Sequence, residues 1–168
     1  MRSACLCVQF SLWCQVQERV SGALLRKKNA SLAEEIDKFV TLRKICDSWF
    51  SSLFVMTFPS ETVARIWDCL WCEGPKVLHR IALTALSRQQ NTIMSMSHST
   101  TLPKILTSKL RRTFDADGLM SAAFHSVGSM PSAMILWIQQ QAEREIRGEP
   151  LLPINRSWKR KLYPTTTT

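Results

Sequence analysis

The stretch from Trp49 to Arg80 constrains the fold of this chain most, because two prolines and a glycine divide it into three apolar segments. Pro59 ends the first segment, Gly74 ends the second and Pro75 begins the third. Proline suits the first turn of a helix, whereas glycine commonly ends one. The stretch therefore predicts a tight unit of helix, turn and helix.

The middle segment, residues 60–73, has the apolar periodicity of an amphipathic helix. Its apolar residues recur at intervals of three and four, which predicts one buried face that includes two indole rings: Val63, Ile66, Trp67, Leu70 and Trp71. Ser60 is the expected N-cap residue of this helix. Glu61 lies four residues before Arg65, which is the favourable order for an ion pair along a helix.

Helical patterning continues on both sides of the central stretch. Residues 21–58 predict a mainly helical region with a boundary at Asn29, followed by a capping box in which Ser31 is the N-cap and Glu34 lies at N3. Further helices are expected over residues 102–114, 119–127 and 131–148. No segment shows the sustained alternation of a strand or a hairpin turn between two strands. We therefore expect an all-α fold built as a multi-helix array.

The order of residues in the central stretch resembles the C-terminal half of the TBC domain, the family of Rab GTPase-activating proteins. The positions that carry the resemblance are Trp49, Phe50, Leu53, Phe54, Pro59, Arg65, Ile66, Trp67, Asp68, Glu73, Gly74, Lys76, Leu78 and Arg80. The resemblance implies the C-terminal half of that helical fold, and an activator of Rab-type small GTPases in vesicle trafficking.

The resemblance also divides the chain into three parts. Residues 16–148 are expected to form a partial, C-terminal TBC-like helical domain. Residues 1–15 stay unassigned, because their sequence does not resemble the start of a helical domain. Residues 149–168 are rich in proline and end in four threonines, so they are expected to form a disordered or loosely packed tail.

Two catalytic motifs of the TBC family are absent from this sequence. TBC domains that accelerate GTP hydrolysis carry an arginine finger in I-x-x-D-x-x-R and a glutamine finger in Y-x-Q, whereas the only tyrosine here is Tyr163. Arg65 and Arg80 lie near Asp68 and Glu73 in sequence, so local ion pairs are their expected role. We therefore expect a truncated or inactive regulator without catalytic residues. The alternative is a non-catalytic helical module that binds a small GTPase or another protein.

The net charge of +9 permits several kinds of acidic partner. The basic residues form three short clusters, at residues 26–28, 104–112 and 156–161, without a nucleic-acid-binding motif. We expect no nucleic-acid partner, and an anionic membrane surface that contacts the second and third clusters is the reserve hypothesis. No stretch approaches the roughly 18 apolar residues of a membrane span, so we expect a soluble chain. The expected location is cytoplasmic, because the cysteines indicate a reducing compartment, with peripheral attachment to endomembranes as an alternative.

The cysteines and histidines do not predict a reactive or metal-binding centre. Cys5, Cys7, Cys69 and Cys72 have spacings that zinc ligands can adopt. The second pair, however, lies in a strongly periodic helical segment, and free cysteines commonly pack as small apolar residues. We expect no metal, no cofactor and a reducing compartment. His79 is expected at the surface or edge of a helix.

Overall fold

The computed structural model describes residues 2–38, 42–95 and 101–153, and these residues form nine α-helices and no strand. In chain order the helices are α1 (Arg2–Lys28), α2 (Ala30–Lys38), α3 (Leu42–Ser51), α4 (Ser60–Glu73), α5 (Lys76–Arg88), α6 (Gln90–Met94), α7 (Leu102–Leu110), α8 (Ala116–His125) and α9 (Ser132–Arg147). The predicted all-α fold is confirmed. None of these helices combines the length and apolar character needed to cross a membrane.

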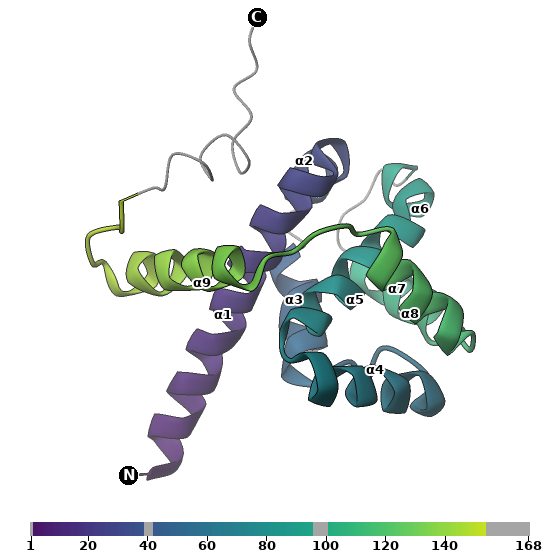
Figure 1. Ribbon diagram of the computed structural model, residues 1–168, viewed down its shortest axis with the longest axis horizontal. Coiled ribbons are helices and arrows are strands. Elements are labelled where there is room, and N and C mark those ends of the chain that lie inside the picture. Colours follow the sequence, from purple (N-terminus) through teal and green to yellow (C-terminus); the bar gives the residue numbers. More distant parts are fainter. Residues whose placement is uncertain (1, 39–41, 96–100, 154–168) are drawn as a thin grey trace, which may run out of the picture.

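The long helix α1 packs most extensively against α3 and α9, and α9 crosses it (Figure 1). Its N-terminal turns project beyond the other helices (Figure 1). The sequence of residues 1–15 does not suggest a helical start, but α1 already begins at Arg2. Val16, Val20 and Leu24 recur every four residues and are all buried, so α1 enters the core along one stripe.

The junction between α1 and α2 lies at the predicted boundary but uses a different cap. The Asn29 side-chain oxygen accepts a hydrogen bond from the Leu32 backbone N–H at 3.1 Å and another from the Ser31 hydroxyl at 3.0 Å. The capping box predicted on Ser31 is therefore wrong. Because α2 begins at Ala30, the side chain that can reach the third amide of the helix is that of Asn29.

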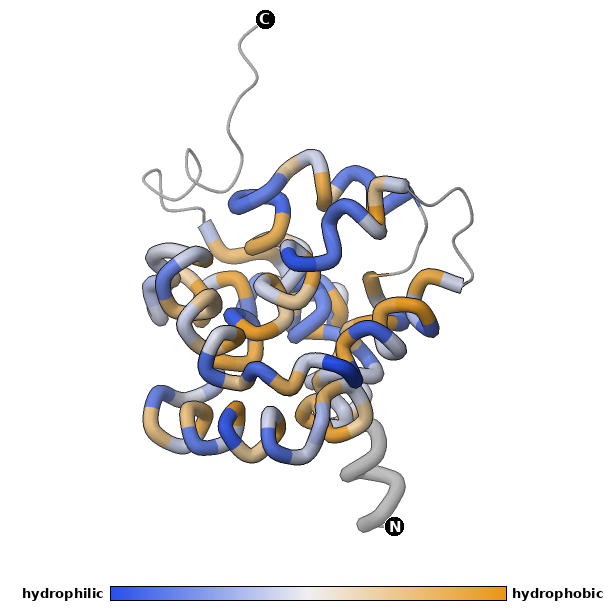
Figure 2. Tube along the Cα trace, turned by 90° about the vertical axis from the view of Figure 1, so that its right-hand side faces the viewer, coloured by the Kyte–Doolittle hydropathy of each residue, from blue (hydrophilic) through white to orange (hydrophobic). Residues whose placement is uncertain are grey.

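The core lies where α3 and α5 meet. In α5 every residue from Val77 to Leu86 is buried except Arg80. Hydrophobic and hydrophilic residues alternate in short stretches along the other helices, as expected for helices with one face toward this core (Figure 2). Helix α5 is therefore the central helix, which its neighbours cover.

The segment after α3 departs from the mainly helical pattern predicted through residue 58. Helix α3 ends at Ser51, and Leu53 and Phe54 adopt φ values of 45° and 68°. Residues with side chains rarely adopt this left-handed conformation. This conformation lets the Phe54 backbone N–H donate a hydrogen bond to the Trp49 carbonyl at 2.9 Å. The Phe54 ring is fully buried. The unfavourable backbone conformation at Leu53 and Phe54 thus accompanies the burial of the Phe54 ring.

The last two helices begin and end near the predicted residues. Asp115 caps α8, Pro131 precedes α9, and Gly148 ends α9 in the left-handed conformation with a φ of 70°. Phe114 is an exception, because the apolar pattern places it on a buried helical face whereas it follows α7 and is 67% exposed.

The predicted tail divides into two parts. Its first residues are held against α9, since Gln141 donates to the Leu152 carbonyl at 2.7 Å and accepts from the Leu152 N–H at 3.0 Å. These two bonds hold Leu152 beside α9, and the disordered or loosely packed tail expected over residues 149–168 stays a prediction. Residues 154–168, and residues 96–100 of the predicted loop, lie outside the described part of the chain.

Candidate functional site

The central stretch forms a corner in which α4, α5 and α8 pack against one another (Figure 1). Pro59, rather than the predicted Ser60, occupies the N-cap position of α4, without a side-chain cap bond. Gly74 ends α4 with a φ of 82° and donates its N–H to the Leu70 carbonyl, and Pro75 immediately precedes α5. The predicted unit of helix, turn and helix is confirmed, and the positive φ explains the glycine.

Several family-motif residues form an aromatic core, which we define as Trp49, Phe50 and Phe54. The Phe50 ring centroid lies 6.1 Å from that of Phe54, and the Trp49 and Phe54 centroids are 5.8 Å apart. Trp13 of α1 meets Phe50 edge to face at 6.2 Å. The motif residues Ile66 and Leu78 are also buried and Leu53 is partly buried. These motif positions therefore hold the fold together.

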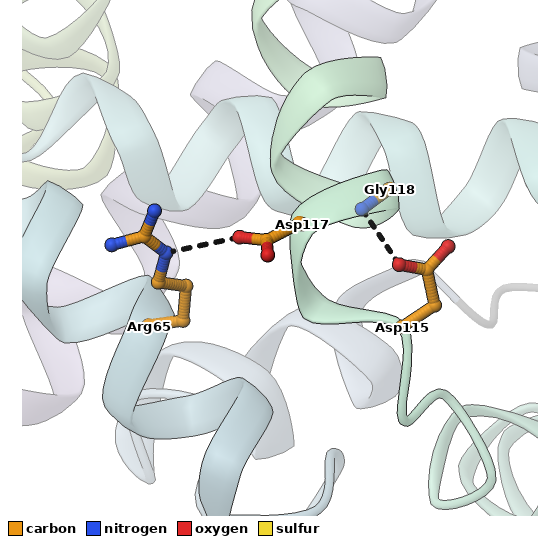
Figure 3. Close-up of polar contacts among 4 residues, drawn as sticks. All are labelled: Arg65, Asp115, Asp117 and Gly118. Atoms are coloured by element: carbon orange, nitrogen blue, oxygen red, sulfur yellow. Dashed lines mark hydrogen bonds and ion pairs between the residues drawn. The ribbon is translucent and has the colours of Figure 1, made fainter.

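Arg65 connects α4 to α8. Its Nε lies 3.3 Å from the Asp117 carboxylate, in an exposed ion pair (Figure 3). Beside it, the Asp115 carboxylate accepts the Gly118 N–H at 2.8 Å and caps α8 (Figure 3). The local ion pair predicted for Arg65 is therefore wrong, because its partner lies on another helix.

Arg80 fastens α5 to α8 more tightly. Its Nη1 donates to the carbonyl oxygens of Ala123 at 3.1 Å and Gly128 at 3.2 Å, and its guanidinium lies 5.3 Å from the centroid of the Phe124 ring. The expected local ion pair is wrong here too. Carbonyls and a ring at the C-terminal end of α8 provide the partners, consistent with the affinity of cations for helix C-termini and aromatic faces.

The local ion pair of this corner joins two other motif residues. Lys76 Nζ lies 2.7 Å from the Glu73 carboxylate across the turn between α4 and α5. The hydrogen bond from Lys76, and then its charge, lower the pKa of Glu73. Both side chains are solvent-accessible, so the pair positions the turn more than it stabilises the fold.

The outer face of α4 is exposed and carries two indole rings. We call this face the α4 ridge and define it as Ala64, Trp67, Asp68 and Trp71, which follow one another at helical spacing. Trp67 is 37% exposed and Trp71 is 82% exposed, so the prediction that both indoles are buried is wrong. The apolar arc of α4 is wider than the area that α5 and α8 cover.

Trp67 and Trp71 differ in how their indoles are held. The Trp67 Nε1 donates to the Leu53 carbonyl at 3.1 Å, which fixes its ring beside the turn after α3. Trp71 is much more exposed and lies one helical turn further along α4. An exposed tryptophan next to a positioned one is typical of an interface anchor. The helical spacing of Trp67 and Trp71 shows that the two residues share one face of α4. The sequence does not show which other helices cover that face, so it could not identify the ridge as exposed.

His79 is buried, in contrast to the surface position predicted from the sequence. Its Nδ1 lies 3.0 Å from the Ser21 hydroxyl of α1, and its ring centroid is 5.4 Å from that of Phe50. Burial lowers the pKa of His79 to about 4. The apolar residues Ala82 and Leu83, three and four positions further along the helix, are the sequence signal that could have placed it inside. Its chemistry at neutral pH is that of a neutral hydrogen-bonding core residue.

The described cysteines pack as individual thiols. Cys14 and Cys46 are buried, Cys69 is partly buried and Cys72 is exposed, and none of these four forms a disulfide. Burial raises the pKa of the Cys46 and Cys69 thiols, which opposes thiolate formation. Among the residues that the structure describes, no three acidic, histidine or cysteine side chains are placed to hold a metal ion.

Comparison with known proteins agrees with this architecture. The sequence profile of the Rab-GTPase-TBC domain family matches residues 8–94, which span most of α1 and all of α2 to α6. This match covers more than half of the chain, and the protein belongs to the Rab-GTPase-TBC domain family. The match begins within α1, before the expected start at Val16.

The curated relatives carry the same domain. Growth hormone-regulated TBC protein 1 of Xenopus tropicalis is 42% identical over 81 residues, covering 48% of this chain and 24% of that protein. The human protein of that name is 29% identical over 138 residues, covering 79% of this chain and 40% of its own. TBC1 domain family member 2B of Mus musculus is 31% identical over 122 residues, covering 72% of this chain and 13% of that protein.

Each of these relatives is much longer than the part that aligns with this chain. The chain spans less than half the length of each of these relatives. No solved structure matches this chain at a significant level.

Proposed function

We propose that this chain is a GTPase-binding regulator of the TBC family that acts on a Rab-type small GTPase in vesicle trafficking and does not itself accelerate GTP hydrolysis. Family membership supports the choice of partner. The absence of I-x-x-D-x-x-R and Y-x-Q from the sequence supports the lack of catalysis, since both finger side chains must reach the nucleotide. Its proposed place of action is the cytoplasmic face of endomembranes.

The observation that carries this proposal is the α4 ridge. Trp71 is 82% exposed on a helix whose ends are fixed by Gly74 and Pro59 and whose position is fixed by α5 and α8. Tryptophans at the centre of protein interfaces commonly contribute 2 kcal/mol or more to binding. A rigid helix that presents an indole beside the carboxylate of Asp68 therefore has the chemistry of a protein-binding surface.

The family-motif residues have two proposed roles in this function. Those of the aromatic core, together with Arg80, keep α3, α5 and α8 in place. Trp67 and Asp68 of the ridge, by contrast, would contact the GTPase directly. This division predicts that ridge substitutions weaken binding without unfolding the protein.

The test measures binding and catalysis separately with the purified full chain and a panel of Rab-type GTPases loaded with a GTP analogue. We expect at least one GTPase to bind, and Trp71→Ala to weaken that binding by roughly 30-fold, the equivalent of about 2 kcal/mol. Leu136→Ala is the matched control, because Leu136 is also a large exposed apolar residue but lies on α9.

Single-turnover GTP hydrolysis with each bound GTPase distinguishes the two parts of the proposal. We expect the hydrolysis rate to stay at the intrinsic value of the GTPase. An acceleration would overturn the proposed lack of catalysis. Failure of every GTPase to bind would instead favour the alternative, a helical interaction module for another class of protein.

A further inference from the structure

The outer face of α7 forms an open basic groove, which we call the α7 groove. Its volume is about 530 Å³, and it is lined by Pro103, Lys104, Thr107, Ser108, Arg111 and Arg112. These residues follow the spacing of one helical face, and the three cationic side chains are exposed. Residues 101–114 contain no aspartate or glutamate. The groove therefore presents positive charge without local neutralisation.

The nearest carboxylates in sequence have other partners. Asp115 accepts the Gly118 N–H and caps α8, while Asp117 pairs with Arg65 (Figure 3). Both interactions draw these carboxylates toward α8 and α4. The positive charge of the α7 groove thus remains available to a ligand outside the chain.

The first basic cluster of the sequence, residues 26–28, differs in this respect. Arg26 pairs with Asp37 at 2.7 Å, and Lys28 donates to the Ser129 carbonyl at 3.2 Å. That cluster therefore serves contacts within the fold. Both clusters reach solvent, but Arg26 is paired with a carboxylate, whereas Lys104, Arg111 and Arg112 form no ion pair among the described residues.

Two exposed apolar side chains border the α7 groove. Arg111 Nε donates to the Met56 carbonyl at 3.3 Å, which brings the turn between α3 and α4 beside the end of α7. Met56 is 57% exposed. Phe114 is 67% exposed and follows the groove directly, with its backbone N–H bonded to the Arg112 carbonyl. Basic and large apolar side chains thus share one region of the surface.

We propose that the α7 groove binds the headgroups of anionic lipids and places the chain on a membrane surface, with Phe114 and Met56 entering the interfacial layer. Charge complementarity supports this occupant, because each Lys or Arg near an anionic bilayer adds attraction. The apolar border distinguishes a bilayer from nucleic acid or an acidic protein loop, since apolar side chains gain by entering the headgroup region. This inference goes beyond the proposed GTPase binding, which uses the α4 ridge.

The first experiment measures sedimentation of the full chain with phosphatidylcholine vesicles, with and without phosphatidylserine. We expect binding that requires phosphatidylserine and weakens with salt. The double variant Lys104→Gln, Arg112→Gln should lower the partition coefficient by roughly 25-fold, because each basic residue near an anionic surface contributes roughly fivefold. Arg111 stays unchanged because it also bonds the chain at Met56.

The matched control is the double variant Lys44→Gln, Arg147→Gln. It removes the same charge from exposed positions on α3 and α9. We expect this control to bind vesicles within about twofold of the unmodified chain, by the same surface-charge argument. An equal loss in both double variants would overturn the proposal, because the attraction would then depend on net charge alone. Unchanged vesicle binding by the α7 variant would overturn it as well.

A second pair of variants tests insertion of the apolar border. Phe114→Ser should weaken vesicle binding even at high salt, whereas Leu136→Ser on α9 should leave it unchanged. Far-UV circular dichroism of each variant checks that the helices are retained. Binding to duplex DNA, without binding to vesicles, would overturn the lipid assignment and identify the α7 groove as a nucleic-acid contact.

Discussion

The aromatic core and the α4 ridge come from the same central stretch but have opposite environments. In the aromatic core, Phe50 contacts Trp13 of α1 and His79 of α5, and its side chain is completely buried. On the α4 ridge, Trp71 is largely exposed although its helix is equally apolar in sequence. The difference follows from where each segment lies, since α3 lies between α1 and α5 whereas α4 lies at the edge of the molecule (Figure 1).

This contrast shows that one pattern of aromatic residues can serve two purposes. A ring that several helices enclose contributes its transfer free energy to folding. A ring that remains in water contributes little to folding and keeps that free energy available for association. Substitutions in the two regions should therefore separate stability from binding.

The largest expected effect comes from truncating the aromatic core. Phe50→Ala should lower the free energy of unfolding by about 3–5 kcal/mol, because it opens a cavity between α1, α3 and α5. Trp71→Ala should change it by no more than about 0.5 kcal/mol, as is usual for an exposed residue. Urea unfolding followed by circular dichroism measures both values. A large loss in Trp71→Ala would show that the α4 ridge is packed in solution.

The second effect concerns His79, which packs against Phe50 of the aromatic core and makes the stability of the fold depend on pH. Burial holds the pKa of His79 at about 4, below its ordinary value of 6.5. Above pH 6.5 the imidazole is neutral in both the folded and unfolded states. Below that pH the unfolded chain takes up the proton first, so His79 should reduce stability by about 3 kcal/mol between pH 6.5 and pH 4.

Thermal unfolding across this pH range tests the assignment. His79→Gln removes the titrating group while its amide can still reach the Ser21 hydroxyl, so its melting temperature should depend less on pH. The control His125→Gln, which changes an exposed histidine of α8, should keep the full dependence. Identical pH profiles for both variants would show that His79 is hydrated in the folded state.

The sequence predicted local structure well and tertiary partners poorly. Gly74, Pro75 and Gly148 mark helix ends correctly because their backbone requirements are local. Periodicity along α4 could not show that α5 and α8 cover only one side of it. The same limit explains the surface position predicted for His79, since a polar residue of one helix can find a buried partner as distant in sequence as Ser21.

The candidate sites follow the same division. The family-motif positions could be identified from their order alone, but their roles depend on contacts between helices distant in sequence. Charge spacing identified residues 104–112 as basic, whereas the apolar border of the α7 groove depends on the contact between Arg111 and the turn at Met56. Sequence patterns thus identified the basic cluster, and the fold determined which side chains accompany it.

The smallest expected effect compares the two arginines that attach the corner to α8. Arg80→Ala should lower the free energy of unfolding by about 2 kcal/mol, because it removes charged hydrogen bonds to the carbonyls of Ala123 and Gly128 and leaves these groups without their donor. Arg65→Ala should lower it by less than about 1 kcal/mol, since the pair with Asp117 is exposed and screened by water.

Salt provides the control for this comparison, because it screens the exposed pair more strongly than the half-buried contacts of Arg80. The small effect of Arg65→Ala should vanish in high salt, whereas that of Arg80→Ala should persist. If both effects vanished, Arg80 would act through charge at the surface. Persistence of the Arg80 effect alone would show that Arg80, on the core side of the corner, provides the main attachment of α8.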